Sequence, residues 1–185
     1  MKAKRTARKV VFVLNDSDEM LKELSSFCES FGVRVVTSQC VGEAVKLARE
    51  LAATGAAVLA FVDLMLPLSL SDLNPLRKTI EERRRKIQGC LADGAGREQR
   101  LIEARKEFEA LDRQTEALID AEGGLTFLRE CSPWIQEWRI VIMSAASFEC
   151  ISKSRETGVS LQKVLRVPVS SDELESVVVE FLRGE

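Results

Sequence analysis

Apolar residues along the chain fall into two alternating patterns. Short runs rich in β-branched residues occur at 10–14, 33–36, 57–62, 140–143 and 164–167. Elsewhere apolar residues recur at three- and four-residue spacing, most clearly over 20–31, 44–52 and 174–182. The runs predict strands, and the spaced residues predict amphipathic helices. Strands that are nearly continuously apolar and alternate with helices predict a parallel α/β sheet covered on both faces, with ligands beyond the carboxyl ends of its strands.

The segment 71–122 breaks this alternation. It has no strand pattern, and positions 75–122 hold 11 Lys or Arg and 11 Asp or Glu. Its apolar residues form two heptad-like stripes separated by a turn at 93–96, namely Leu76, Ile80, Ile87 and Leu91, then Leu101, Ala104, Phe108, Leu111 and Leu118. The pattern predicts an antiparallel, coiled-coil-like helical hairpin inserted into a domain made of 1–70 and 123–185. The balanced charges favour a solvated helix surface over a polyelectrolyte-binding one.

Composition and charge exclude several classes of function. The chain has 185 residues, a net charge of −2 and no histidine, which argues against nucleic-acid or membrane partners and removes histidine-dependent catalysis and zinc ligation. The odd number of widely spaced cysteines indicates a reducing compartment, and nothing at the start of the chain reads as a signal peptide. The longest apolar stretch, 55–70, is too short for a membrane span and contains Asp63. We therefore expect a cytoplasmic protein.

Acidic residues follow two of the predicted strands. Asn15 and Asp16 end the first strand, and Asp63 ends the third. In a flavodoxin-like, doubly wound sheet of order 2-1-3-4-5 these strands are neighbours, so Asp16 and Asp63 meet in one crevice. Two close carboxylates repel each other unless a cation lies between them, and an all-oxygen ligand set suits Mg²⁺. The crevice is a candidate magnesium site, with the Ser144 hydroxyl at the same edge.

Simpler roles exist for the same residues. Asp16 and Glu19 have the spacing of a capping box at the start of the first helix, as Ser170 and Glu173 do at the last. Asp63 is a candidate turn cap. Taken together, the residues favour the shared crevice over separate capping roles. Asp63 interrupts the most apolar stretch of the chain, where an unpaired carboxylate is costly.

A set of short motifs carries a family resemblance. They are Asn15-Asp16 after the first strand, Asp63-Leu64-Met65-Leu66-Pro67 after the third, Ser144-Ala145 after the fourth, and Pro168 ahead of Ser170-Ser171-Asp172-Glu173-Leu174. Together they resemble the receiver domain of two-component response regulators, over about residues 9–67 and 123–185. The resemblance implies that Asp63 accepts a phosphoryl group from a histidine kinase. It also implies that Asn15, Asp16, Asp63 and the Met65 carbonyl bind Mg²⁺, and that Ser144 hydrogen-bonds the phosphoryl oxygens.

The sequence departs from the family pattern at several of these positions. Val167 stands where the family places a lysine. Arg166, one residue earlier, is a candidate substitute for that lysine. Because side chains alternate along a strand, Arg166 should face away from the crevice unless a bulge or turn reorients it. Val164 stands where the family has an aromatic switch residue, and Asn15 replaces one acid of the metal site. We therefore expect Mg²⁺ binding and Asp63 phosphorylation to be weak or absent.

Three functions follow. The first is a non-enzymatic, receiver-like signalling adapter that binds a protein partner, such as a histidine kinase or signalling complex, or a second copy of itself through 71–122. The alternative is a phosphorylatable single-domain response regulator. A third is a phosphohydrolase of the haloacid-dehalogenase type, suggested by Asp16-Ser17-Asp18. The order of the remaining motifs argues against this last function, because Asp63 precedes Ser144 and no acidic pair follows.

Overall fold

The computed structural model describes residues 8–69, 122–144 and 148–184, together with Ser71, Asn74, Pro75, Lys78, Glu81, Glu82 and Arg85. Its centre is a five-stranded sheet in the order β2-β1-β3-β4-β5, and all adjacent strands are parallel. The strands are β1 (Lys9–Leu14), β2 (Arg34–Ser38), β3 (Ala57–Val62), β4 (Arg139–Ser144) and β5 (Leu161–Arg166). The predicted flavodoxin-like order, which places β1 and β4 on either side of β3, is confirmed.

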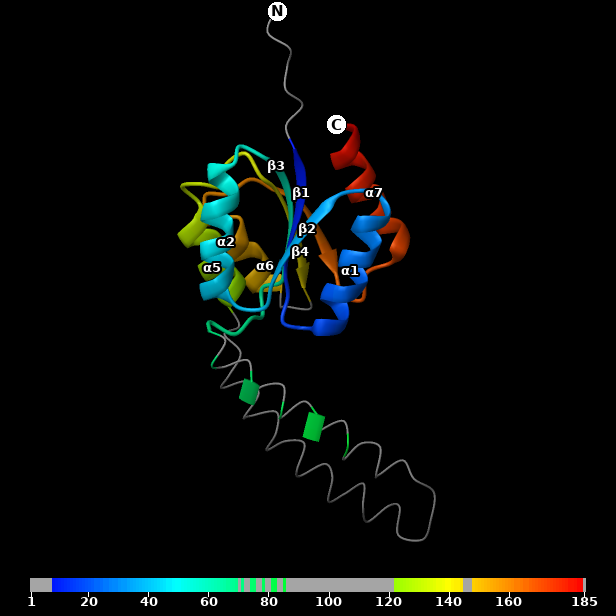
Figure 1. The fold of residues 1–185 in the computed structure, drawn as a ribbon. Helices are drawn as coiled ribbons and strands as arrows, with labels where there is room; N and C mark the ends of the chain where they lie inside the picture. The colour runs from blue at the N-terminus through cyan, green and yellow to red at the C-terminus, as the bar shows by residue number, and fades with distance from the viewer. Residues whose placement is uncertain are drawn as a thin grey trace, which may run out of the picture.

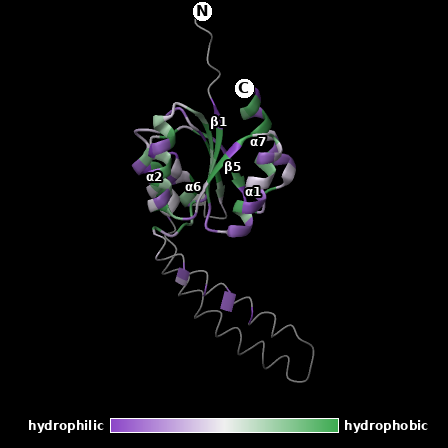
Figure 2. Cartoon of the chain, viewed as in Figure 1, coloured by the Kyte–Doolittle hydropathy of each residue, from purple (hydrophilic) through white to green (hydrophobic). Residues whose placement is uncertain are grey.

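Helices cover both faces of the sheet (Figure 1). α1 (Asp18–Ser30) and α7 (Ser171–Arg183) lie on one face, and α2 (Val41–Ala53), α5 (Gly123–Cys131) and α6 (Phe148–Ser154) lie on the other. Hydrophobic residues concentrate in the central strands, whereas the helices combine hydrophobic and hydrophilic residues (Figure 2). None of the helices described is long and apolar enough to cross a membrane.

The alternation of side chains along the strands divides the core into two clusters. Phe12 and Phe127 stack in the cluster beneath α2 and α5, with ring centroids 5.7 Å apart. The other cluster joins Phe61, Met143 and Phe181 beneath α1 and α7. Residues 11–14 and 58–62 are fully buried, so β1 and β3 are closely packed along their length. Asn15 and Asp63 directly follow these two strands.

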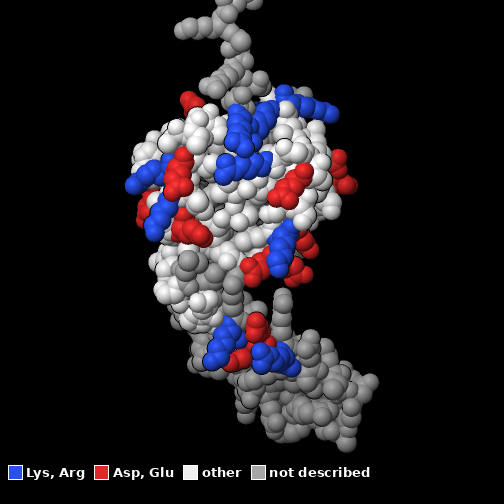
Figure 3. Space-filling model, viewed as in Figure 1, with Lys and Arg blue, Asp and Glu red and all other residues white. Residues whose placement is uncertain are grey.

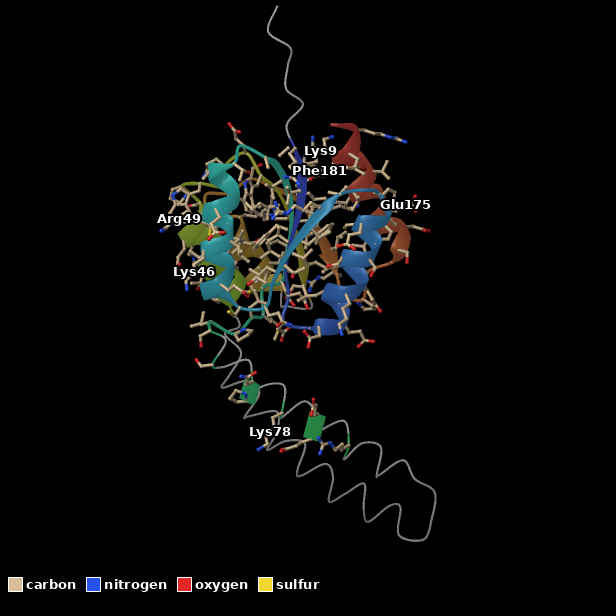
Figure 4. The ribbon with its side chains drawn as sticks, viewed as in Figure 1. Lys9, Lys46, Arg49, Lys78, Glu175 and Phe181 are labelled. Carbon is tan, nitrogen blue, oxygen red and sulfur yellow. The ribbon has the colours of Figure 1, made fainter. Side chains whose placement is uncertain are left out.

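The amino end of the sheet is joined to α7. Lys9 at the start of β1 donates from Nζ to the Phe181 carbonyl oxygen at 2.9 Å and lies 5.5 Å from the centroid of the Phe181 ring (Figure 4). A cation at a helix carboxyl terminus is favourable because it faces the negative end of the helix dipole.

Of the two capping boxes considered from the sequence, one is present in the structure and the other is not. Ser170 and Glu173 form the predicted capping box of α7. At α1, however, the N-cap is Ser17, whose hydroxyl accepts from the Met20 amide at 3.3 Å, so the capping box expected between Asp16 and Glu19 is wrong. The hydroxyl of Ser17 serves this role, which leaves Asp16 outside the helix at the end of β1.

The proposed insertion, 71–122, falls for the most part outside the described residues, and so do its two apolar stripes. The residues that are described between 71 and 85 have helical conformation, and all of them except Glu82 are exposed. Arg85 pairs with Glu81 one turn earlier at 3.3 Å. The division into 1–70, 71–122 and 123–185 stays a prediction.

Candidate functional site

Asp63 lies immediately after β3, at the carboxyl edge of the sheet. Its backbone amide donates to the Leu14 carbonyl oxygen at 2.9 Å, which ties it to the end of β1. The carboxyl group is partly buried between the ends of β1 and β4. This is the edge at which parallel α/β sheets bind ligands.

Three donors from the chain occupy the Asp63 carboxyl group. The Ser144 hydroxyl donates to Oδ1 at 2.6 Å, and the Met65 amide donates to the same oxygen at 3.2 Å. The Asn15 side-chain amide donates from Nδ2 to Oδ2 at 3.1 Å. Each carboxyl oxygen therefore has a protein partner, and the Met65 contact is the turn-capping role considered for Asp63.

The orientation of the Asn15 amide is fixed from two sides. Its Oδ1 accepts from the Ser17 backbone amide at 2.9 Å while its Nδ2 points at Asp63. Asn15 is 4% exposed, and its own backbone amide donates to the Ser38 carbonyl oxygen at 3.1 Å. Asn15 therefore presents a hydrogen-bond donor to the crevice, and its side-chain oxygen faces the Ser17 amide at the start of α1.

Burial dominates the electrostatics of Asp63. It raises the pKa of the carboxyl group above its usual value of 3.8, because burial disfavours the charged form. Hydrogen bonds from the Ser144 hydroxyl and from the Met65 and Leu64 amides oppose this effect and lower the pKa. Acidic side chains also gather at the start of α1, where Asp18 and Glu19 occupy the first turn (Figure 3).

The fifth strand places the predicted cation positions differently from the sequence expectation. A register irregularity between Ile140 and Val141 pairs Arg166 with Ser144. Register partners point to the same face, so Arg166 emerges on the face of the sheet that carries the Ser144 side chain, and it is exposed. The irregularity lies near the start of β5, between Leu161 and Lys163, and from Val164 to Arg166 the pairing with β4 is regular. Whether Arg166 replaces the lysine stays a prediction.

The two valines near the end of β5 take part in packing. Val164 packs against the core cluster beneath α2 and α5, and Val167 packs against the cluster beneath α1 and α7. The peptide bond between Val167 and Pro168 is cis. At both positions an aliphatic side chain contributes to the core, with neither an aromatic ring nor a charge to act on the crevice.

The residues present do not fit a divalent cation as they are arranged. Such a cation needs several oxygen ligands, yet Asn15 offers an N–H group and both Asp63 oxygens already accept hydrogen bonds. Within the described part of the chain, no group of three or more His, Cys, Asp or Glu side chains is arranged to hold a metal ion. Asp16 is half-buried beside Asn15, and Met65 contacts Asp63 through its amide.

The start of α5 packs directly against the loop that follows Asp63. The Gly124 amide donates to the Leu64 carbonyl oxygen at 3.0 Å. A Cβ atom at Gly124 would overlap the Asp63 carbonyl oxygen, and one at Gly123 would lie 2.5 Å from the Leu66 carbonyl oxygen. Only glycine allows the helix to approach this closely. In the sequence, the available signal for this contact is the Gly-Gly pair itself.

The loop after Asp63 is also fixed on its other side. The carbonyl oxygens of Pro67 and Leu68 accept from the Val41 and Gly42 amides at 3.1 and 3.0 Å. These contacts satisfy amides in the first turn of α2, whose N-cap residue makes no side-chain cap. The loop after Asp63 is thus held as far as Leu68, and the next continuously described segment begins at Glu122.

Ion pairs form at Glu122, the residue just before α5. Glu122 accepts from Lys153 of α6 at 2.6 Å and lies 3.7 Å from Arg129 of α5. The hydrogen bond from Lys153 is the main cause of the lowered pKa of Glu122. Because these groups are substantially exposed, the pairs add little to stability.

Comparison with solved structures identifies the fold. The chain superimposes on a CheY-like receiver domain from Methanospirillum hungatei with a TM-score of 0.58 and 14% identity, covering 96% of both chains. It matches the BeF3-activated receiver domain of Klebsiella pneumoniae RstA with a TM-score of 0.54 and 18% identity, covering 95% of this chain and 98% of that one.

A Burkholderia pseudomallei response regulator, solved with a phosphorylated aspartic acid, a calcium ion and citrate, gives a TM-score of 0.53 at 14% identity, over 92% of this chain and 66% of that one. No protein-family model matches the sequence, and no curated protein is detectably similar to it. The fold is therefore that of response-regulator receiver domains.

Proposed function

We propose that this chain, which has the receiver fold, is a signalling adapter that acts by protein–protein contact through residues 71–122, with Asp63 phosphorylation weak or lost. Its partner would be a protein of a two-component pathway, such as a histidine kinase or signalling complex, or a second copy of the chain. The proposal places it in the cytoplasm and gives it no catalytic turnover, nucleic-acid partner or membrane partner.

One observation carries the proposal. The Asp63 carboxyl group is held by hydrogen bonds from Asn15, Ser144 and the Met65 amide, with aliphatic residues at the two positions where the family has a lysine and an aromatic residue. Attack of a carboxylate on a phosphoryl group needs positive charge to stabilise the transition state. The pKa of Asp63 is shifted by burial and by neutral donors, and no cation of the described part of the chain is among the causes.

The segment 71–122 supplies the interaction surface in this proposal. The described residues that flank it, in the loop after Asp63 and at the start of α5, are held by the core, so an insertion between them need not disturb the core packing. By sequence it has two apolar stripes, and two helices alone cover only part of these stripes. A partner helix or a second copy would cover the remainder.

The phosphorylatable regulator is the second candidate. Two observations favour it: the Ser144 hydroxyl already lies at Asp63, and Arg166 shares a face with Ser144. In that case the Arg166 guanidinium would supply the missing positive charge. The dehalogenase-type phosphohydrolase has less support, since Asp18 in the first turn of α1 accepts a hydrogen bond from Gln39 at 2.6 Å.

Phosphodonor labelling followed by intact mass tests the proposal. The wild-type chain and the Val167→Lys variant are each incubated with a small-molecule phosphodonor and Mg²⁺. The Asp63→Asn variant is the control. We expect the wild type to stay at its unmodified mass. We also expect Val167→Lys to be labelled on the order of 10²-fold faster, because the lysine restores charge at the transition state.

Rapid, stoichiometric labelling of the wild type that Asp63→Asn abolishes would contradict this proposal and favour the regulator. In that case Arg166→Gln should remove the labelling. Turnover of a generic phosphate ester, lost in Asp16→Asn, would instead favour the phosphohydrolase.

A further inference from the structure

We infer that the Asn15 amide takes the place of a cation at Asp63, so that the crevice is satisfied by the chain's own donors, and that Asn15→Asp alone would turn it into a divalent-cation site. This inference deepens the proposed function, because it gives a physical reason for weak or lost Asp63 phosphorylation, and it rests on the proposed function only in that respect. It makes Asn15 the residue that decides whether the crevice responds to metal.

The first step is that the amide cannot be reversed. In the orientation found, Nδ2 donates to Asp63 and Oδ1 accepts from the Ser17 amide. Turning the group over would set its oxygen against the Asp63 carboxylate and its nitrogen against the Ser17 N–H group. Both contacts would then be repulsive at a site that is 4% exposed, where unpaired polar groups are costly.

The second step concerns what a cation would meet. Approaching Asp63 Oδ2, it would face the positive hydrogen atoms of the Asn15 amide, and at Oδ1 it would compete with the Ser144 hydroxyl and the Met65 amide. The donors therefore do electrostatically what the cation would do, since each places partial positive charge on a carboxyl oxygen. A fold with this arrangement gains little from Mg²⁺.

The third step concerns Asn15→Asp, which replaces the side-chain nitrogen by an oxygen. Aspartate has the shape of asparagine, so at position 15 it would keep the acceptor that faces the Ser17 amide. It would also put an oxygen where Nδ2 now lies, 3.1 Å from Asp63 Oδ2. Two carboxylates this close cannot both stay ionised without a counter-charge. They must share a proton or take up a cation, and oxygen ligands at this spacing suit Mg²⁺.

Calorimetric titration of the full chain with MgCl2 at neutral pH tests the inference, together with thermal unfolding with and without Mg²⁺. We expect the wild type to show little saturable heat and no shift of its unfolding temperature. Asn15→Asp should bind Mg²⁺ at least about tenfold more tightly, unfold at a lower temperature without metal, and recover when Mg²⁺ is added.

Two controls separate the causes. Asn15→Ala removes the amide without adding an acid, so it should lose stability and show no response to Mg²⁺. The double variant Asn15→Asp with Asp63→Asn should lose the gained binding, because it removes the second carboxylate.

Wild-type binding as tight as that of Asn15→Asp would overturn the inference, and so would an Asn15→Asp variant with no gain in binding, which would mean that the pair shares a proton instead. The phosphodonor experiment has a separate readout, the mass gained at Asp63. Asn15→Asp still has Val167 in place of the lysine, so labelling tests the proposed function and Mg²⁺ binding tests this inference.

Discussion

At the scale of single residues, the pKa of the Asp63 carboxyl group is set by a balance between burial and the hydrogen bonds that it accepts. Burial raises its pKa, and the Ser144 hydroxyl is the strongest of the groups that lower it. Removing that hydroxyl should therefore raise the pKa further. We expect Ser144→Ala to show this in a carbon-13 NMR titration of the Asp63 side chain, with Asp63→Asn used to assign the signal. A pKa that is unchanged or lower in Ser144→Ala would contradict the hydrogen bond described here.

The same balance sets a pH dependence of stability. The pKa of Asp63 is raised in the folded chain, so at pH values between 3.8 and that raised pKa the folded state holds a proton that the unfolded state has lost. The free energy of unfolding attributable to Asp63 must then fall as the pH rises through this window, and it is fully present below it. Urea unfolding at several pH values checks this. The difference between wild type and Asp63→Asn should decline with rising pH and then level off, and a difference that grows with pH would mean that the pKa is lowered instead.

Much of this crevice could be predicted from the sequence, because polar residues that follow buried strands must gather at one edge of a parallel sheet. Asp63 and Ser144 needed only the strand pattern and the strand order. The orientation of the Asn15 amide could not be predicted, because it depends on where the Ser17 amide points once α1 has begun. The Asn-x-Ser spacing that permits this turn is too common to indicate it on its own.

At the scale of elements, the strands with buried neighbours on both sides were the easiest to predict. β3 begins and ends as expected at 57 and 62, while β5 begins three residues before the predicted 164 and ends before Val167. β5 is an edge strand, and its first half carries the exposed residues Gln162 and Lys163, so it shows no apolar run. The residues of the helix between β4 and β5 were not predicted, because α6 is only seven residues long.

The contact of α5 with the loop after Asp63 gives a prediction at the same scale. Gly124→Ala should destabilise the fold by roughly 1–3 kcal/mol, because the added methyl group would overlap the Asp63 carbonyl oxygen and force the helix away. Gly42→Ala is the matched control, since it also adds a methyl group near the first turn of a helix, but there the nearest atom is 3.4 Å away. Chemical unfolding measures both. Equal effects of the two substitutions would mean that α5 does not pack on the loop as closely as described.

At the scale of the whole molecule, the proposed insertion 71–122 is flanked by described residues that the core holds. Contacts of the loop with α2 and α5 anchor the chain just before and just after this segment, and both anchors lie within the core. Replacing 71–122 with a short Gly/Ser linker should therefore leave a chain that folds cooperatively, because the loop to be closed is short. Circular dichroism and thermal unfolding check this. A linker chain that fails to fold would show that 71–122 is part of the core.

The most direct test of the central claim is the mass in solution of the full chain and of the linker chain, each measured by sedimentation with and without phosphodonor and Mg²⁺. A chain that signals by contact through 71–122 should associate, with itself or with an added partner, to the same extent in both conditions, while the linker chain stays monomeric and unbound. Association that appears only with phosphodonor, or that the linker chain retains, would contradict the account.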